Sequence, residues 1–191
     1  MASFEEVLAA IGSARARSPR IVVGVSGYGG AGKSTLARRL LEAVPDSARV
    51  RGDDFLVPAL IRERSSDWSA IDRTRLRIDV LEPFRSGRPA LVRRLDWGSG
   101  ALQAPEPVPA ASVLIVDAVG LFHPDLDALL DLRVWVDVDL ATATERGRAR
   151  DERRGDVDTG AWDAVWAPNE RDFAERFAPR QRADLRYDPS A

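Results

Sequence analysis

Residues 21–35 read Ile-Val-Val-Gly-Val-Ser-Gly-Tyr-Gly-Gly-Ala-Gly-Lys-Ser-Thr, and this stretch decides the fold. Its first six residues are apolar or small and rich in β-branched side chains, which predicts a buried strand. Residues 34–44 return to a helical spacing of leucines. The glycine-rich turn between them satisfies the pattern G-x-x-x-x-G-K-[ST] in the strand–loop–helix context that this pattern requires. We therefore expect a phosphate-binding loop at the N-terminus of a helix.

In such a loop the glycines let backbone N–H groups converge on phosphate oxygens. Lys33 is predicted to bridge the β- and γ-phosphates, and the Ser34 hydroxyl is predicted to coordinate Mg²⁺. The expected ligand is ATP with Mg²⁺, held by Gly27, Gly29, Gly30, Ala31, Gly32, Lys33, Ser34 and Thr35. The alternative is a flexible glycine turn that matches the pattern by chance. Against it stands Lys33, which is the only lysine among the 28 basic residues of the chain.

The composition narrows the classes of function. The chain has 191 residues, 28 basic and 30 acidic, mixed along its length, which is typical of one globular domain and argues against a nucleic-acid surface. With no cysteine and one histidine, any metal must be held by oxygen. We see neither a secretory signal nor an apolar run long enough to span a membrane, so we expect a cytoplasmic protein without a membrane partner. A homo-oligomer is left open.

Strands alternate with helices along the chain. We predict strands at residues 21–26, 49–52, 112–116, 131–137 and 183–187, and helices at 3–17, 34–44, 74–84, 140–151 and 161–177. This order implies a doubly wound, parallel five-stranded sheet with flanking helices, the α/β fold of P-loop NTPases. We expect a single domain over residues 1–191, with an acceptor-site insertion at 58–110 over the carboxyl edge of the sheet and a helical lid at 146–160.

Carboxylates follow two of the predicted strands. Asp53 and Asp54 end the second strand and Asp117 ends the third, and in open α/β sheets ligands bind beyond these ends. Asp53 is predicted to accept the proton of an attacking hydroxyl and to offer a metal ligand, and Asp54 to contact the acceptor. Asp117 fits an acid that holds Mg²⁺ directly or through water. The alternative for each is a turn-forming aspartate.

Asp117-Ala118-Val119-Gly120 also spells D-x-x-G, which follows the same strand in GTP-binding switches. Such switches read guanine with an N/T-K-x-D motif. Because the only lysine lies in the phosphate loop, the chain contains no such motif. The switch interpretation is therefore much the weaker one, and a nucleotide-dependent switch or regulatory ATPase is kept as the alternative of another class.

Several arginines lie on and just after the helix predicted at residues 140–151. Arg146 and Arg150 are spaced i and i+4, so they share one helix face and could both reach one triphosphate. We predict that they stabilise charge during transfer, and we expect residues 155–160 to form the tip of the lid. The alternative is a solvated, charged helix end.

Taken together, these segments resemble the uridine kinase and phosphoribulokinase-like group of P-loop kinases. The resemblance extends from residue 21 to about residue 188, and it rests on six segments in order: Val25-Ser26-Gly27, Gly52-Asp53-Asp54-Phe55, residues 117–122, residues 136–139, residues 146–151 and Arg182-Ala183-Asp184. It implies that Asp53 is the base and that Arg146 and Arg150 are lid arginines. The acid after the third strand is commonly glutamate in that group, and here it is the shorter Asp117.

The resemblance also implies contacts to the acceptor. Leu95-Asp96-Trp97 falls where uridine kinases have a Tyr-Asp-Phe-like segment, and Asp67 falls where they bind the ribose hydroxyls. We therefore expect Asp54, Asp67, Asp96 and Trp97 at the acceptor site. The expected reaction is ATP-dependent phosphorylation of a hydroxyl on a small molecule, with uridine or cytidine as the leading acceptor. Nicotinamide riboside, pantothenate and sugar-like alcohols are the alternatives.

Overall fold

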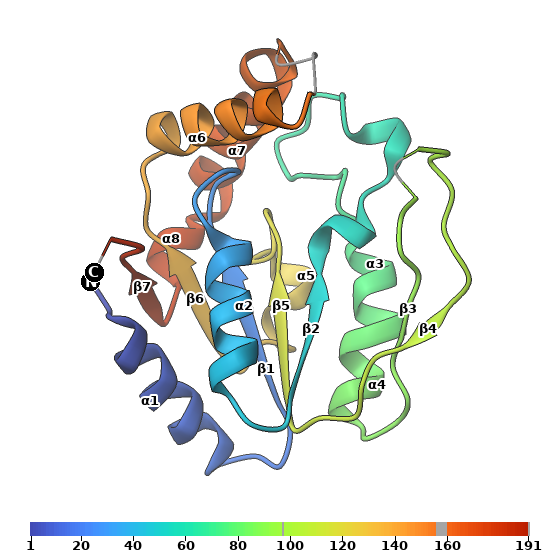
Figure 1. Cartoon of the computed structure of the whole chain (residues 1–191), viewed down its shortest axis with the longest axis vertical. Helices are drawn as coiled ribbons and strands as arrows, with labels where there is room; N and C mark the ends of the chain where they lie inside the picture. Colours follow the sequence, from blue (N-terminus) through green and yellow to red (C-terminus); the bar gives the residue numbers. More distant parts are fainter. Residues whose placement is uncertain (97, 156–159, 191) are drawn as a thin grey trace.

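A central sheet of five parallel strands organises the protein (Figure 1), whose computed structural model describes residues 1–96, 98–155 and 160–190. The strands stand in the order β2-β5-β1-β6-β7, and every neighbouring pair is parallel. Their bounds are β1 Ile21–Ser26, β2 Ser47–Arg51, β5 Val113–Asp117, β6 Leu132–Val136 and β7 Leu185–Tyr187. The predicted doubly wound, parallel five-stranded sheet is confirmed.

The neighbouring strands β1 and β5 are buried along their whole length, as expected for strands covered on both faces. The parallel register pairs both Val25 of β1 and Arg51 of β2 with Asp117 of β5. The carboxyl ends of three neighbouring strands therefore meet at one place, directly beside the glycine-rich loop.

Helices cover both faces of the sheet. Their bounds are α1 Phe4–Arg15, α2 Lys33–Ala43, α3 Arg73–Arg75, α4 Glu82–Arg85, α5 Pro124–Asp127, α6 Leu140–Arg153, α7 Ala167–Phe177 and α8 Pro179–Arg182. Short 3₁₀ turns stand at η1 Gly52–Phe55 and η2 Pro58–Leu60. One core cluster joins α1 and α2 to one face of the sheet, and a second joins α4 and α5 to the other face. Successive strand residues point to opposite faces, so β1 contributes Val23 to the first cluster and Val22 to the second.

Two predicted helices differ from expectation in the same way. The helix predicted at residues 74–84 runs from α3 through a π-helical segment, η3 Leu76–Leu81, into α4. The helix predicted at 161–177 begins with a second π-helical segment, η4 Trp162–Trp166, before α7. Each π-helical segment lies just before a proline, Pro83 or Pro168. A proline lacks the N–H of the α-helical ladder and its ring crowds the carbonyl four residues earlier, so the helix widens there.

The segment between β2 and β5 lies differently from the prediction. Leu76, Val80 and Phe84 pack against strand residues in the second core cluster, so the helix from α3 to α4 covers a face of the sheet. The expectation that this whole segment lies over the carboxyl edge is therefore wrong for residues 73–85. The rest of the segment includes a two-stranded antiparallel hairpin, β3 Leu91–Val92 with β4 Glu106–Pro107.

The N-terminal helix begins as predicted. Ser3 accepts a hydrogen bond from the Glu6 N–H, and the Glu6 carboxylate accepts one from the Ser3 N–H, which completes a capping box. The two ends of the chain lie side by side (Figure 1), because Ala2 bridges to Tyr187 of β7. Among the described residues, no helix has both the length and the apolar character needed to cross a bilayer.

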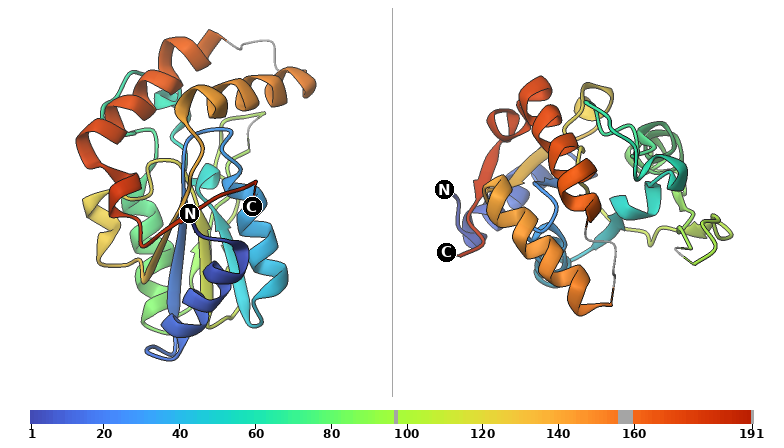
Figure 2. Two further views of the ribbon diagram at one scale, coloured as in Figure 1. Left: turned by 90° about the vertical axis from the view of Figure 1, so that its left-hand side faces the viewer. Right: turned by 90° about the horizontal axis from the view of Figure 1, so that it is seen from above.

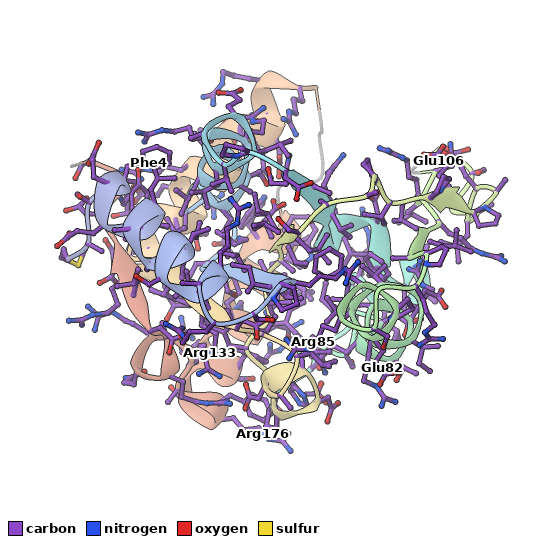
Figure 3. All side chains as sticks on the ribbon, turned by 90° about the horizontal axis from the view of Figure 1, so that it is seen from below. Phe4, Glu82, Arg85, Glu106, Arg133 and Arg176 are labelled. Carbon is purple, nitrogen blue, oxygen red and sulfur yellow. The ribbon has the colours of Figure 1, made fainter. Side chains whose placement is uncertain are left out.

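Opposite ends of the sheet have different surroundings. At the end away from the glycine-rich loop (Figure 3), Arg85 pairs with Asp131 at 2.6 Å and Arg133 pairs with Asp184 at 3.4 Å. At the loop end, α6 and α7 lie side by side across the top of the molecule (Figure 2). The ligand-sized spaces described below lie under these two helices.

Candidate active site

The predicted phosphate loop connects β1 to α2. Gly30 and Gly32 have φ values of 86° and 105°, in the left-handed region that favours glycine, and Gly32 is the N-cap of α2. The Lys33 ammonium folds back over the loop and donates to the Tyr28 carbonyl at 2.8 Å. The loop amides and the N-terminus of α2 therefore face one concave space together with a cation, which is the arrangement that binds phosphate.

Ser34 and Asp117 meet behind the loop. The Ser34 hydroxyl donates to Asp117 Oδ2 at 2.7 Å, so a hydroxyl and a carboxylate stand side by side as predicted from the sequence. Arg49 was not predicted: its Nε and Nη2 donate to the two oxygens of Asp117 at 2.7 and 2.8 Å. An arginine inside the short strand predicted before Asp53 is the sequence signal that could have found it.

This donor set suits Mg²⁺ when phosphate and water oxygens complete the shell, because Mg²⁺ prefers oxygen and keeps several waters. Both oxygens of Asp117 are already engaged by Arg49, and the residue is buried. Ser34 is therefore the residue that fits direct coordination, and Asp117 fits a contact through water. Asp53, the third predicted ligand, lies at the mouth of the same space, where its carboxylate stands 3.3 Å from Arg51.

A cavity of about 420 Å³ opens in front of the loop, which we call the loop cavity. Its charged lining consists of one acid, Asp53, and seven cations: Lys33, Arg38, Arg49, Arg51, Arg146, Arg150 and Arg154. Guanidinium groups bind phosphate oxygens in a bidentate manner. The loop cavity therefore suits a highly charged anion of the size of a polyphosphate.

A second cavity of about 480 Å³ adjoins the first, and we call it the tryptophan cavity. Its apolar walls are Leu56, Ile61, Trp68, Val119, Trp162 and Trp166. Four residues line both cavities: Arg51, Asp53, Arg150 and Arg154. Asp53, half-exposed, is the carboxylate among these four, so it stands at the border between an anion site and an aromatic site.

Three predicted acceptor contacts do not line the tryptophan cavity. Asp54 is buried, lines a separate space of about 230 Å³ beside β3, and has a pKa raised by that burial. Asp67 accepts from the Ser65 hydroxyl at 2.6 Å, a bond that lowers its pKa. Asp96 closes a surface turn by accepting from the Gly98 N–H and the Ser99 hydroxyl. Trp97, the fourth predicted contact, lies outside the described residues.

The helix α6 packs directly onto the phosphate loop. A Cβ atom at Gly30 would lie 2.0 Å from the Ala143 carbonyl oxygen, and one at Gly147 would lie 2.2 Å from the Trp162 ring. Trp162 in turn donates through Nε1 to Asp151 at 3.1 Å. This close approach brings the predicted arginines, Arg146 and Arg150, to the loop cavity. Of the predicted lid tip, residues 156–159 lie outside the described part of the chain.

One wall of the tryptophan cavity is held in place by Asn169. Its side-chain oxygen accepts from the Ser65 N–H at 2.9 Å and from Arg64, and its amide donates to the Glu63 carbonyl at 2.9 Å. Trp166 Nε1 donates to the Ile61 carbonyl at 2.9 Å. The segment after η2 is therefore tied to α7 and η4.

Glu170, which the sequence did not single out, reaches the phosphate loop from α7. Its Oε1 accepts from the Gly29 N–H at 2.6 Å. Burial raises its pKa to about 7, and the Lys33 ammonium and the Gly29 N–H partly oppose that rise. Burial also lowers the pKa of Lys33, which the negative charge of Glu170 partly offsets. A buried carboxylate thus lies beside the only ammonium side chain of the site.

Comparisons with known proteins agree with this geometry. No protein-family model matches the chain. The uridine-cytidine kinase C of Dictyostelium discoideum is 30% identical over 121 residues, which are 61% of this chain and 26% of that protein. The chain therefore spans about a quarter of the length of this curated relative.

Two solved structures share the fold. A possible uridine kinase from Bacillus stearothermophilus superposes with a TM-score of 0.71 at 16% identity, over 96% of this chain and 100% of that one. A protein from Silicibacter sp. TM1040 assigned as a fructose transport system kinase gives a TM-score of 0.77 at 20% identity, over 97% and 99%. The predicted resemblance to uridine kinase-like P-loop kinases is confirmed, in sequence over part of the chain and in fold over nearly all of it.

Proposed function

We propose that this chain transfers the γ-phosphate of ATP to a hydroxyl group of a small molecule, with a nucleoside such as uridine or cytidine as the leading acceptor. The observation that carries the proposal is the position of Asp53, which lines both the cation-rich loop cavity and the tryptophan cavity. A phosphoryl donor in the first cavity and an alcohol in the second would both lie beside this carboxylate. The sequence relative and the shared fold support a kinase.

The donor is bound by the phosphate loop. The loop amides and Lys33 hold the phosphates, and Arg146 and Arg150 approach from α6 to offset the charge that develops on the transferring group. Ser34 and Asp117 would hold Mg²⁺, which supplies further neutralisation of phosphate charge when it is bound. Arg49 engages both oxygens of Asp117, so of these two residues Ser34 is the one that fits direct coordination.

The acceptor hydroxyl is activated by Asp53. The oxygen of the acceptor hydroxyl forms a bond to the γ-phosphorus. The bond between that phosphorus and the β–γ bridging oxygen breaks, and ADP leaves. The hydroxyl proton passes to the Asp53 carboxylate. The Arg51 guanidinium lies 3.3 Å from this carboxylate.

The walls of the tryptophan cavity favour a flat acceptor. Trp166, which is partly exposed, offers a ring surface on which a heterocyclic base can stack, and the buried Trp68 and Trp162 line the same cavity. Nicotinamide riboside has the same general shape, whereas pantothenate and sugar-like alcohols lack a ring of this kind. We therefore rank nucleosides above the other alcohols.

The test is the release of ADP from MgATP, with and without a mixed panel of nucleosides and small alcohols. A kinase responds to its acceptor, so we expect stimulation by at least one nucleoside. A nucleotide-dependent switch or regulatory ATPase would release ADP at the same rate with and without the panel. That result would replace the proposal by the alternative of another class.

A further inference from the structure

Glu170 occupies the end of the phosphate loop that faces the tryptophan cavity. Gly29 and Glu170 line that cavity, whereas Gly30, Gly32 and Ser34 line the loop cavity. The Gly29 N–H donates to Glu170 Oε1 at 2.6 Å. The other carboxylate oxygen, Oε2, is buried and has no hydrogen-bond partner within the described residues. A side-chain carboxylate thus stands where the loop meets the acceptor side.

Charged groups of both signs lie near Glu170. The Lys33 ammonium is the cation that lowers the pKa of Glu170. The negative charges of Glu170 and Asp53 in turn raise the pKa of Lys33. The groups that share the tryptophan cavity with Glu170 are Arg51, Asp53, Arg150, Asp151 and Arg154. Tyr28, next to Gly29, has a pKa that burial and then Glu170 raise. Glu170 is buried, and Trp162 and Trp166 line the same cavity.

A bound triphosphate changes this balance. Even as its Mg²⁺ complex it brings net negative charge to the loop, and it draws the Lys33 ammonium towards phosphate oxygens. A desolvated carboxylate beside them loses its compensating cation and gains like-charged neighbours, and both changes favour the protonated form. Protonation forms one O–H bond on a carboxylate oxygen, with a proton taken from solvent.

We propose that Glu170 is a positioning residue that holds the Gly29 amide as a carboxylate in the free protein and takes up one proton from solvent when MgATP binds. The neutral acid still accepts the hydrogen bond from the Gly29 N–H through one oxygen, and its other oxygen carries an O–H donor at the tryptophan cavity. The inference rests on the nucleotide-binding part of the proposed function, and it names a role for a residue outside the motifs. Because burial already raises the pKa of Glu170 to about 7, a modest further push is enough near neutral pH.

Proton uptake is measured by isothermal titration of MgATP into the whole chain at pH 8, in two buffers with different ionisation enthalpies. One unit above a pKa of about 7, roughly nine-tenths of Glu170 is ionised before binding. We compare the wild type with Glu170→Gln, which keeps a carbonyl acceptor for Gly29 but cannot titrate. The matched control is Glu175→Gln, an exposed acid on the same helix α7.

We expect the wild type and Glu175→Gln to take up at least half a proton more per MgATP than Glu170→Gln does. MgADP, which lacks the terminal phosphate, should cause less uptake than MgATP in the wild type. Equal uptake by all three proteins would overturn the inference while leaving nucleotide binding intact. Absence of any MgATP binding by the wild type would instead remove the proposed function itself.

The wild type alone gives a second readout if Glu170→Gln does not fold. Uptake per MgATP should fall as the pH is lowered from 8 to 6, because Glu170 is then already protonated in the free protein. An uptake that stays constant over this range would contradict the inference.

Discussion

Arg49 donates two hydrogen bonds to Asp117, at 2.7 and 2.8 Å, and thereby neutralises the carboxylate that ends the central strand β5. The side chains are only 14% and 3% exposed, so this pair is shielded from water. Removal of one partner would leave a buried charge beside Ser34 and the phosphate loop. The pair is therefore part of the framework of the site as well as of its electrostatics.

We expect Arg49→Met to lower the free energy of unfolding by about 3 kcal/mol, because an unpaired buried carboxylate is left behind. The control is Arg94→Met, which breaks a pair with Glu106 whose side chains are 53% and 50% exposed. Its loss should be about 1 kcal/mol or less. Urea unfolding followed by circular dichroism measures both. Equal losses for the two variants would show that the Arg49 pair is no more than a surface contact.

The packing of α6 on the loop depends on Gly147. An alanine there would place its Cβ 2.2 Å from the Trp162 ring, so Gly147→Ala should destabilise the protein by about 1–3 kcal/mol. Gly12 of α1 has no atom within 4 Å of the equivalent position, and Gly12→Ala should stabilise by about 0.5–1 kcal/mol. Thermal unfolding measures the two shifts, which should have opposite signs. Two shifts of the same sign would argue against close packing of Trp162 on α6.

Glu170 makes stability depend on pH. The folded protein keeps its proton up to a pKa of about 7, whereas the unfolded chain releases it near the ordinary value of 4.5. Between these values the folded state binds more protons, so the contribution of Glu170 is fully present below about 4.5 and is lost as the pH rises through about 7. The free energy of unfolding of Glu170→Gln relative to the wild type should therefore increase by about 2–3 kcal/mol from pH 5 to pH 8.

This pH series is free of the other titrating groups, because they are common to both proteins. Glu175→Gln should show no such trend. A constant difference between Glu170→Gln and the wild type would mean that Glu170 titrates as an ordinary surface glutamate.

Substitutions of Asp53 and Lys33 are expected to change different measured quantities. Asp53→Asn should lower kcat by at least about 100-fold, while the MgATP dissociation constant stays within about 3-fold, because general-base catalysis is lost but binding is kept. Lys33→Ala should mainly weaken MgATP binding. Asp79→Asn, on the face-covering helix and away from both cavities, serves as the control. Near-normal kcat in Asp53→Asn would remove Asp53 from the base role.

Features that depend on residues close together in the sequence could be predicted from the sequence alone. The glycine-rich loop, the apolar strands and the N-terminal helix each depend on local spacing, and all three appear in the structure. The two π-helical segments were missed because a helical period does not show how a proline such as Pro168 is accommodated within a longer helix.

Contacts between distant segments could not be read in the same way. Glu170 meets Gly29 across 141 positions, and Arg49 meets Asp117 across 68, so only the packing of α7 and β2 brings them together. Asp54 follows Asp53 directly and yet lines a different cavity, because consecutive residues of η1 point to different sides. Motif spacing places a backbone segment, whereas side-chain direction is decided by tertiary packing.

The transfer step itself is tested most directly with ATP labelled at the γ-phosphate. The purified chain is incubated with the Mg²⁺ complex of this ATP and a mixed panel of nucleosides and small alcohols, and the products are separated and weighed by mass spectrometry. We predict that the label appears on one organic acceptor, and that Asp53→Asn forms this product at least about 100-fold more slowly. Label that appears only as inorganic phosphate, at a rate independent of the panel, would contradict a kinase with Asp53 as its base.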